Sequence, residues 1–277
     1  MAKKKYKVKI GNIIAAIIGI ASFCILVYSL SNIIRWKKDG DATKKQIEEI
    51  EEKTEVEEVK EDSENVEIIE QEEKPDESNP YWDFIKMSLI SVDFSDLKEA
   101  NSDTVGWIQV NGTNVNYPFV QTDNNSYYLT HSFNKSYNSA GWVFLDYRNS
   151  KNLTDKNNII YAHGRIENTM FGSLRTTLTN GWLNNQSNYV FKISTPSMNT
   201  MWQVFSVYKI APVTDYLQVN FPSDSEYSNF LNTIIGRSAF NFETSVSKDD
   251  TIITLSTCYD DNNRMVLHGK LIKKENR

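Results

Sequence analysis

An almost continuously apolar run of 25 residues, from Ile10 to Ile34, is the feature that most constrains this chain. As an α-helix rising about 1.5 Å per residue, the run is long enough to cross a bilayer core of about 30 Å. Five lysines precede it and three basic residues come after it. The positive-inside rule therefore predicts a basic cytoplasmic terminus at residues 1–9, a transmembrane helix at residues 10–34, and an extracellular location for the chain beyond residue 38.

A cleaved signal peptide is the main alternative for this run. The run is longer than an ordinary signal-peptide core, and no small-x-small cleavage site clearly ends it. Cys24 lies inside the run, and the bulky Phe23 before it disfavours a lipidated cysteine. We interpret Cys24 as a lipid-embedded residue, which leaves Cys258 without an exported partner for an intrachain disulfide.

The charge of the chain is unevenly distributed. Residues 39–79 carry eighteen Asp or Glu against five Lys. The segment 35–80 is therefore predicted to be an acidic linker, either a frayed helix or a disordered stalk. An acidic interaction tail is a further possibility, although charge runs are more often simply solvated. Residues 81–277 are nearly neutral and have no basic stripe with interleaved aromatics, which argues against a nucleic-acid partner.

From residue 81 onward the composition becomes aromatic and β-branched, and the segment is long enough for one domain with a sizeable core. Helical spacing is found over residues 82–89, 94–99, 170–178 and 225–235. Strand patterns, with Asn111-Gly112 as a hairpin turn, cover residues 105–110, 115–120, 141–145, 158–162, 189–193, 202–210, 252–257 and 265–272. We expect a mainly β domain, built as a barrel with peripheral helices.

The last two predicted strands place a cysteine opposite an arginine. Residues 259–263 are a run of turn formers, so the sequence predicts a hairpin whose five-residue loop is flanked by Cys258 and Arg264. In a symmetric register their Cβ atoms lie roughly 5 Å apart on one face. A guanidinium at that distance favours the thiolate, which is the nucleophilic form of cysteine. The alternative is an inert, packed cysteine beside an arginine that caps a strand end.

Three histidines are available as partners for a thiolate. His163 directly follows the apolar strand 158–162, at a strand end that opens into a loop, where catalytic side chains are common. By pattern alone, a chemical role and a structural role are equally open for His163. His131 lies in a polar, loop-like context. His268 is interpreted as structural, because it lies about 13 Å beyond Arg264 along the same strand.

Several short motifs occur in order over about residues 95–272. They are Val105-Gly106-Trp107-Ile108 with Gly112-Thr113-Asn114-Val115-Asn116-Tyr117-Pro118, Tyr127-Tyr128-Leu129-Thr130-His131, Phe144-Leu145-Asp146-Tyr147-Arg148, Ile160-Tyr161-Ala162-His163-Gly164 with Met170-Phe171-Gly172, and Thr254-Leu255-Ser256-Thr257-Cys258 with Arg264-Met265-Val266. Together they resemble the class B sortases, which are membrane-anchored cysteine transpeptidases of Gram-positive bacteria. The resemblance implies a sortase-type closed β-barrel for residues 81–277.

The resemblance also implies roles for individual residues. Cys258 would be the nucleophile, His163 the general acid and base, and Arg264 the group that positions substrate and stabilises the oxyanion. The chain departs from the family pattern in a shorter loop after Cys258 than in some relatives and in Ala162, where the family usually has glycine. Three further residues are implied to line the groove for the sorting peptide: Asn125, Leu129 and Ser256.

The implied reaction consists of two acyl transfers. The thiolate attacks the Thr-Gly carbonyl of a C-terminal sorting signal, often one that begins Asn-Pro, on an exported protein. The thioacyl enzyme then passes the protein to an amine of peptidoglycan, of its precursor, or of another protein. No metal or organic cofactor is implied, and no Cys/His cluster suggests a zinc site. The predicted location is the cell membrane, with one span and the catalytic domain on the extracellular face.

Two other functions stay open from the sequence. The first is an extracytoplasmic cysteine peptidase, in which water instead of an amine resolves the thioacyl species. The second is a non-catalytic, membrane-tethered binding module whose Cys258 is merely packed. In either enzyme, the segment 212–246 is predicted to form a lid that sets substrate choice.

Overall fold

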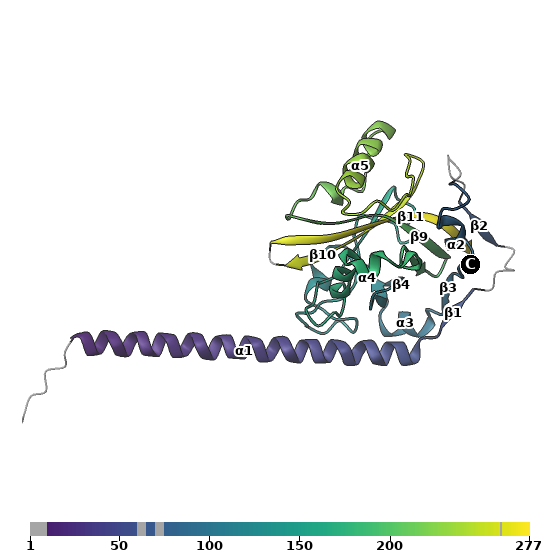
Figure 1. Cartoon of the computed structure of the whole chain (residues 1–277). Helices are drawn as coiled ribbons and strands as arrows, with labels where there is room; N and C mark the ends of the chain where they lie inside the picture. The colour runs from purple at the N-terminus through teal and green to yellow at the C-terminus, as the bar shows by residue number, and fades with distance from the viewer. Residues whose placement is uncertain (1–9, 60–64, 70–74, 261) are drawn as a thin grey trace, which may run out of the picture. The chain divides into compact units, whose positions relative to one another are not determined.

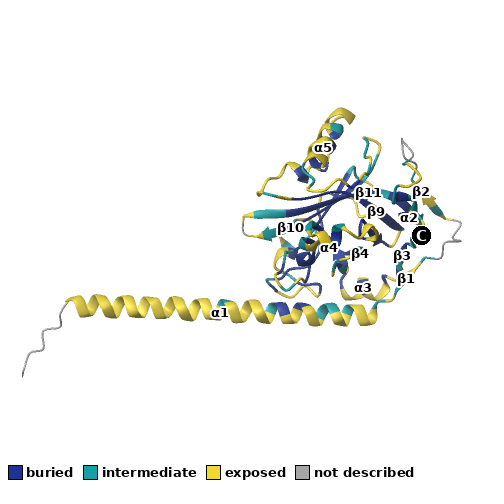
Figure 2. Cartoon of the chain, viewed as in Figure 1, coloured by how far each residue is buried: buried dark blue, intermediate teal, exposed yellow. Residues whose placement is uncertain are grey.

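The computed structural model describes residues 10–59, 65–69, 75–260 and 262–277. It divides into two compact units, Met1–Ala42 and Thr43–Arg277. Helix α1 (Ile10–Lys53) makes up the described part of the first unit and continues into the second. By length and composition α1 can cross a membrane, and its large apolar residues from Ile10 to Trp36 are exposed (Figure 2). The helix runs on well beyond the span predicted at residues 10–34.

Eight of the described strands close into a barrel (Figure 1). They are β4 (Thr104–Val110), β5 (Asn116–Val120), β6 (Phe144–Leu145), β7 (Asn157–Tyr161), β8 (Val190–Ser194), β9 (Met198–Ile210), β10 (Ile252–Asp260) and β11 (Asn263–Asn276). Around the barrel their order is β10, β7, β6, β5, β4, β8, β9 and β11, and β11 pairs with β10 to close the ring. The mainly β, closed-barrel fold predicted from the sequence is confirmed.

The barrel is filled by large apolar side chains. Trp107, Phe191 and Trp202 are completely buried in its core, and the last two rings stack with their centroids 6.2 Å apart. Burying a side chain of this size contributes roughly 1.5–3 kcal/mol, because apolar surface leaves water. The core therefore fixes the strand ends from which the loops emerge.

Two short strands lie inside the acidic segment. β1 (Val56–Glu58) pairs with β3 (Ile90–Val92), and β2 (Val66–Ile68) pairs with β11. Val56 and Val66 pack against the barrel core, whereas their glutamate neighbours are exposed. Parts of the segment 35–80 thus belong to the packed domain, and a linker that ends at residue 80 stays a prediction.

The remaining helices are short, apart from α5. They are α2 (Tyr81–Phe84), α3 (Ser95–Ala100), α4 (Asn180–Leu183), α5 (Asp224–Gly236) and the 3₁₀ helices η1 (Tyr127–Leu129), η2 (Gly172–Leu178), η3 (Gln186–Asn188) and η4 (Asp215–Leu217). The helix predicted over residues 82–89 is wrong in its second half. Helix α2 ends at Phe84, and the chain then leads into β3, where Ile90 and Val92 are buried and pair with β1.

Helix α5 covers part of the outer face of the barrel. It begins at a cap in which the Ser223 side chain accepts a hydrogen bond from the Glu226 backbone N–H, which satisfies one of the free donors of the first turn. Its buried side chains recur at helical spacing and join aromatic residues of β9 and η4 in a second apolar cluster. The cluster contains Phe205, Tyr208, Tyr216, Tyr227, Phe230, Leu231, Ile234, Ile252 and Val266.

His268 is buried beside this second cluster, as its structural interpretation predicts. Thr254 donates its hydroxyl proton to Asn157 at 2.7 Å, so its oxygen accepts from Nδ1–H of His268 at 2.9 Å. Tyr208 can then donate to the unprotonated Nε2 at 2.9 Å. Burial, with a smaller contribution from the Arg237 charge, lowers the pKa of His268 to about 3. The imidazole is therefore neutral in the folded protein.

This burial predicts a pH-dependent stability. Below about pH 6.5 the unfolded chain binds a proton at His268 that the folded chain does not, so the free energy of unfolding falls by about 1.4 kcal/mol per pH unit. The loss continues until the pH approaches the folded pKa of about 3. His268→Gln should remove this part of the slope in urea unfolding between about pH 7 and pH 5. Equal slopes for wild type and variant would contradict the prediction.

Candidate active site

The parallel pairing of β7 with β10 brings two predicted site residues together. The register pairs Tyr161 with Ser256, and the Ala162 N–H donates to the Ser256 carbonyl at 3.4 Å. Two residues further along each strand come His163 and Cys258. Because parallel strands end at the same edge of a sheet, the histidine and the cysteine lie next to each other at this edge of the barrel.

The β10–β11 hairpin adds the arginine. Arg264 lies directly opposite Cys258 in the antiparallel register, as predicted. The five-residue loop predicted over residues 259–263 is wrong, because β10 continues to Asp260 and β11 begins at Asn263. The Asn263 side chain donates to the Asp260 carboxylate at 2.8 Å, which holds the ladder together past the expected turn.

The backbone after His163 touches the strand that carries Cys258. A Cβ built on Gly164 would lie 1.9 Å from the Cys258 carbonyl oxygen, so a side chain does not fit at this position. The loop then folds back, and the Phe171 N–H donates to the His163 carbonyl at 3.0 Å. Direct backbone contact therefore sets a lower limit on the spacing between the two strand ends.

The orientation of the His163 ring is fixed by the end of η1. Its Nε2 lies 2.8 Å from the Leu129 carbonyl oxygen. A carbonyl only accepts hydrogen bonds, so Nε2 carries a proton, and Nδ1 is the nitrogen that can take or give one. The ring is half-buried, as is the free thiol of Cys258.

A cavity of about 530 Å³ opens at this edge of the barrel. All six residues singled out from the sequence line it: Cys258, His163, Arg264, Ser256, Asn125 and Leu129. The other lining residues are mostly apolar or aromatic and include a stretch of the predicted lid: Phe144, Tyr161, Ala162, Pro212, Val213, Thr214, Tyr216, Leu217 and Thr257. The lining holds two basic side chains, His163 and Arg264, and no acidic one, and its apolar walls suit an uncharged or weakly polar ligand.

Arg264 keeps most of its hydrogen-bond donors available. Within the described chain, its side chain makes one long hydrogen bond, from Nη1 to the Asn263 carbonyl at 3.5 Å. In the same described residues, no three His, Cys, Asp or Glu side chains gather where they could ligate a metal ion. The chemistry that this arrangement offers is that of a thiol, an imidazole and a guanidinium at one strand edge.

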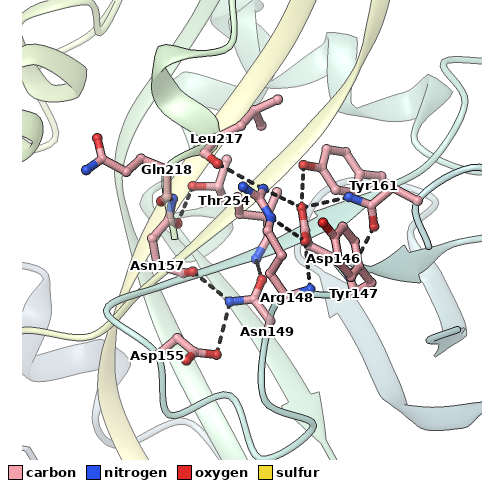
Figure 3. A network of polar contacts seen from close by, with 12 residues as sticks. Asp146, Tyr147, Arg148, Asn149, Asp155, Asn157, Tyr161, Leu217, Gln218 and Thr254 are labelled. Carbon is pink, nitrogen blue, oxygen red and sulfur yellow. Dashed lines mark hydrogen bonds and ion pairs between the residues drawn. The ribbon is translucent and has the colours of Figure 1, made fainter. Parts of the chain in front are cut away.

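The buried carboxylate of Asp146 is the centre of a polar network that includes residues of the cavity lining, and Figure 3 shows its contacts with Arg148 and Tyr161. Asp146 accepts from Nε and Nη2 of Arg148 at 2.9 and 2.7 Å, from the Tyr161 hydroxyl at 2.9 Å and from Nδ2 of Asn125 at 2.9 Å. Nη2 of Arg148 also donates to the Leu217 carbonyl at 3.0 Å. The cavity residues Tyr161, Asn125 and Leu217 therefore share one anchor, although they come from three separate segments.

The charge of this anchor is stabilised locally. Burial alone would raise the pKa of Asp146, but hydrogen bonds from Arg148 and Tyr161 outweigh it and hold the pKa below its ordinary value. Asn125 is held from both sides, because its Oδ1 accepts the Tyr147 N–H at 3.0 Å while its Nδ2 donates to Asp146. The direction in which the Asn125 amide faces the cavity is thus determined.

Sequence reasoning missed the residues that brace the cavity. Tyr216 was seen only as part of the predicted lid, yet its hydroxyl lies 3.1 Å from the Ser256 hydroxyl. Nδ2 of Asn157 holds the same segment by donating to the Tyr216 and Gln218 carbonyls at 3.3 and 2.8 Å. Asp146 lay within a quoted motif without a role, and the only signal in the sequence was a carboxylate two residues before Arg148, directly after the strand 144–145.

Comparisons with known proteins match this architecture. The Sortase domain family model matches residues 108–272. Sortase B of Listeria monocytogenes is 34% identical over 183 residues, which cover 65% of this chain and 74% of the relative. This chain belongs to the sortase family. The expectation from the sequence motifs is confirmed.

Solved structures agree on class B. Sortase B from Bacillus anthracis in complex with AAEK1 shares 30% identity and a TM-score of 0.67, covering 85% of this chain and 99% of that one. A Staphylococcus aureus sortase B–substrate complex shares 33% identity and a TM-score of 0.61, covering 65% and 84% of the two chains. This sortase is thus of class B, and the cysteine transpeptidases are its class of enzyme.

The Asp146 anchor predicts a large effect of its removal on stability. Asp146→Ala takes away the acceptor of Arg148 and Tyr161 and should lower the free energy of unfolding by about 2–4 kcal/mol in urea titrations. Asp83→Ala is the control, because the Asp83 carboxylate is 79% exposed and pairs with Lys86 on the surface. That change should be nearly neutral. Equal losses in both variants would show that Asp146 is not an anchor.

The contact at Gly164 predicts a second effect. In Gly164→Ala the new methyl group must push the Cys258 carbonyl away, so we expect a loss of about 1–3 kcal/mol or more and slower alkylation of Cys258 by iodoacetamide. Gly181→Ala in α4 is the matched control, since its Cβ would meet nothing nearer than the Thr179 Oγ1 at 4.0 Å. It should be neutral or slightly stabilising. Unchanged alkylation in Gly164→Ala would refute the importance of this contact.

Proposed function

We propose that this sortase cleaves a C-terminal sorting signal at a Thr-Gly-type bond and joins the exported protein to a cell-wall amine. The observation that carries the proposal is the common cavity of Cys258, His163 and Arg264. The family adds support, because the relatives include a sortase B solved as a substrate complex. The residue roles follow from the chemistry of the three side chains.

The first step acylates the cysteine. The Cys258 thiolate attacks the carbonyl carbon of the scissile bond, and the carbonyl becomes a tetrahedral oxyanion. Arg264, with donors free of strong internal partners, faces this charge and stabilises it. His163 then gives its Nδ1 proton to the departing amine, the C–N bond breaks, and a thioester remains on Cys258.

The second step transfers the acyl group. The amine of a peptidoglycan unit or its precursor attacks the thioester carbon, and His163 takes one of its protons. The C–S bond breaks, Cys258 leaves as thiolate, and a new amide joins the exported protein to the acceptor. If water takes the place of the amine, the same site acts as a peptidase, so the two functions differ only in the acceptor.

The lining of the cavity supports a peptide of low charge as the substrate. Apolar walls such as Leu129, Val213 and Leu217 suit a proline or an aliphatic side chain, and the fixed Asn125 amide suits a polar neighbour. We therefore propose an uncharged signal of the Asn-Pro-x-Thr type. The segment at residues 212–217, which is part of the lid predicted from the sequence, would select among such signals.

The membrane topology completes the proposal. Helix α1 crosses the bilayer through residues 10–34, with residues 1–9 in the cytoplasm, because the lysines before the span favour that side. The acidic segment 35–80 then carries the catalytic domain, residues 81–277, on the extracellular face. Exported proteins and cell-wall precursors meet there, so the cavity would face both of its substrates.

The proposal predicts a covalent intermediate on one cysteine. Full-length protein in detergent micelles, incubated with Asn-Pro-x-Thr-Gly peptides, should show by mass spectrometry an acyl adduct on Cys258, and an added amine should convert it to a ligated product. Cys258→Ala should abolish the adduct, and His163→Ala should slow its formation about 10²–10⁴-fold, since general acid catalysis is lost.

Cys24→Ala is the matched control, because it removes the other free cysteine and should leave the reaction intact. Cleavage without ligation would favour the peptidase. No adduct with any peptide, and no effect of Cys258→Ala on processing of exported proteins in cells, would instead support a binding module.

A further inference from the structure

Arg175 connects the two strand ends that carry the candidate catalytic residues. It lies in η2 and is half-buried, outside the lining of the cavity. Its Nη2 donates to the Gly164 carbonyl at 2.7 Å and its Nη1 to the Arg165 carbonyl at 3.1 Å. Its Nε donates to the Tyr259 carbonyl at 2.9 Å. One guanidinium therefore holds the residues that directly follow His163 and Cys258.

These hydrogen bonds begin where the strand ladder stops. The β7–β10 register ends at Tyr161 and Ser256, with the Ala162 N–H as its last backbone donor. Beyond that point the segments that follow β7 and β10 need another connection if they are to stay side by side. The Gly164 and Tyr259 carbonyls, which lie just beyond the ladder, both accept from Arg175.

Arginine suits this task better than other residues. The guanidinium is planar and presents five donors in a rigid fork. It can therefore hold carbonyl groups of two separate segments at fixed positions. The Tyr259 ring also lies 6.0 Å from the Arg175 guanidinium carbon, which adds a weak cation–π attraction on the same side. A lysine could reach one or two of the carbonyls but would not fix their relative orientation.

We propose that Arg175 is a positioning residue that sets the separation of His163 and Cys258. It does not touch substrate in this arrangement and acts through the backbone on either side. This inference rests on the proposed function, because it assigns Arg175 to the placement of the general acid and base, His163, relative to the nucleophile, Cys258. We call the three hydrogen bonds from Arg175 to the Gly164, Arg165 and Tyr259 carbonyls the clamp. A displacement near 1 Å between reacting groups can cost about 10²-fold in rate, so loss of the clamp should lower kcat.

The test compares full-length Arg175→Met and Arg175→Lys with wild type in detergent micelles. Arg175→Met should lower kcat for peptide acylation about 100-fold and leave KM within about twofold, since the cavity lining is intact. Arg175→Lys should recover about tenfold of this loss. Arg277→Met is the matched control, because Arg277 also donates to backbone carbonyls, those of Val92 and Thr195, and should keep wild-type kcat.

A double-mutant cycle separates positioning from general destabilisation. In a His163→Ala background, Arg175→Met should cost less than about threefold, because there is no imidazole left to position. A full 100-fold loss in that background would overturn the inference, and so would wild-type kcat in Arg175→Met. Thermal unfolding of each variant identifies any that fail to fold, and Arg175→Lys then carries the comparison.

Alkylation distinguishes failure of this inference from failure of the proposed function. The pH profile of Cys258 alkylation by iodoacetamide needs no sorting peptide. If wild type forms no thioester with any peptide, the proposed function fails. The pH profile of alkylation then decides by itself whether Arg175 positions His163 and Cys258. A profile of Arg175→Met that moves toward that of His163→Ala supports the clamp, whereas a profile identical to wild type overturns it.

Discussion

The pairing of β7 with β10 is the interaction on which the site depends. A parallel pair brings two carboxyl ends to the same edge, and the register of this pair sets His163 beside Cys258. The antiparallel partner β11 then closes the barrel and places Arg264 on the other side of the cysteine. A change of one residue in either register would turn one of these side chains to the opposite face. By fixing the strand registers, the barrel core therefore also fixes the relative positions of His163, Cys258 and Arg264.

The cavity depends on a second constraint, which is electrostatic. Its walls come from segments that are far apart in the sequence, and the Asp146 carboxylate gathers them by accepting hydrogen bonds from Asn125, Arg148 and Tyr161. A buried charge is costly unless its hydrogen bonds are satisfied, so this cluster tolerates few alternative geometries. The same charge reaches the loop at Leu217 through Arg148. The shape of the cavity and the stability of the domain are coupled at this point.

Much of the fold could be predicted from the sequence, because alternation of apolar and polar residues indicates strands directly. The opposition of Cys258 and Arg264 followed from strand pattern and turn formers, but the loop length did not, since Asp260 and Asn263 bond to each other within the ladder. The roles of the groove residues came from family resemblance and not from periodicity. The anchor at Asp146 and the clamp at Arg175 were missed, because their partners are backbone carbonyls and side chains that only the tertiary fold brings near.

The absence of a side chain at Gly164 has a consequence for motion. Its backbone lies against the Cys258 carbonyl, so the ends of β7 and β10 are in direct contact and cannot move closer together. Under the proposed mechanism, a shift of Cys258 toward Gly164 during formation of the tetrahedral adduct would have to move the His163 segment as well. In that mechanism, acid and nucleophile would then share a single displacement, because the contact at Gly164 keeps them from approaching each other further.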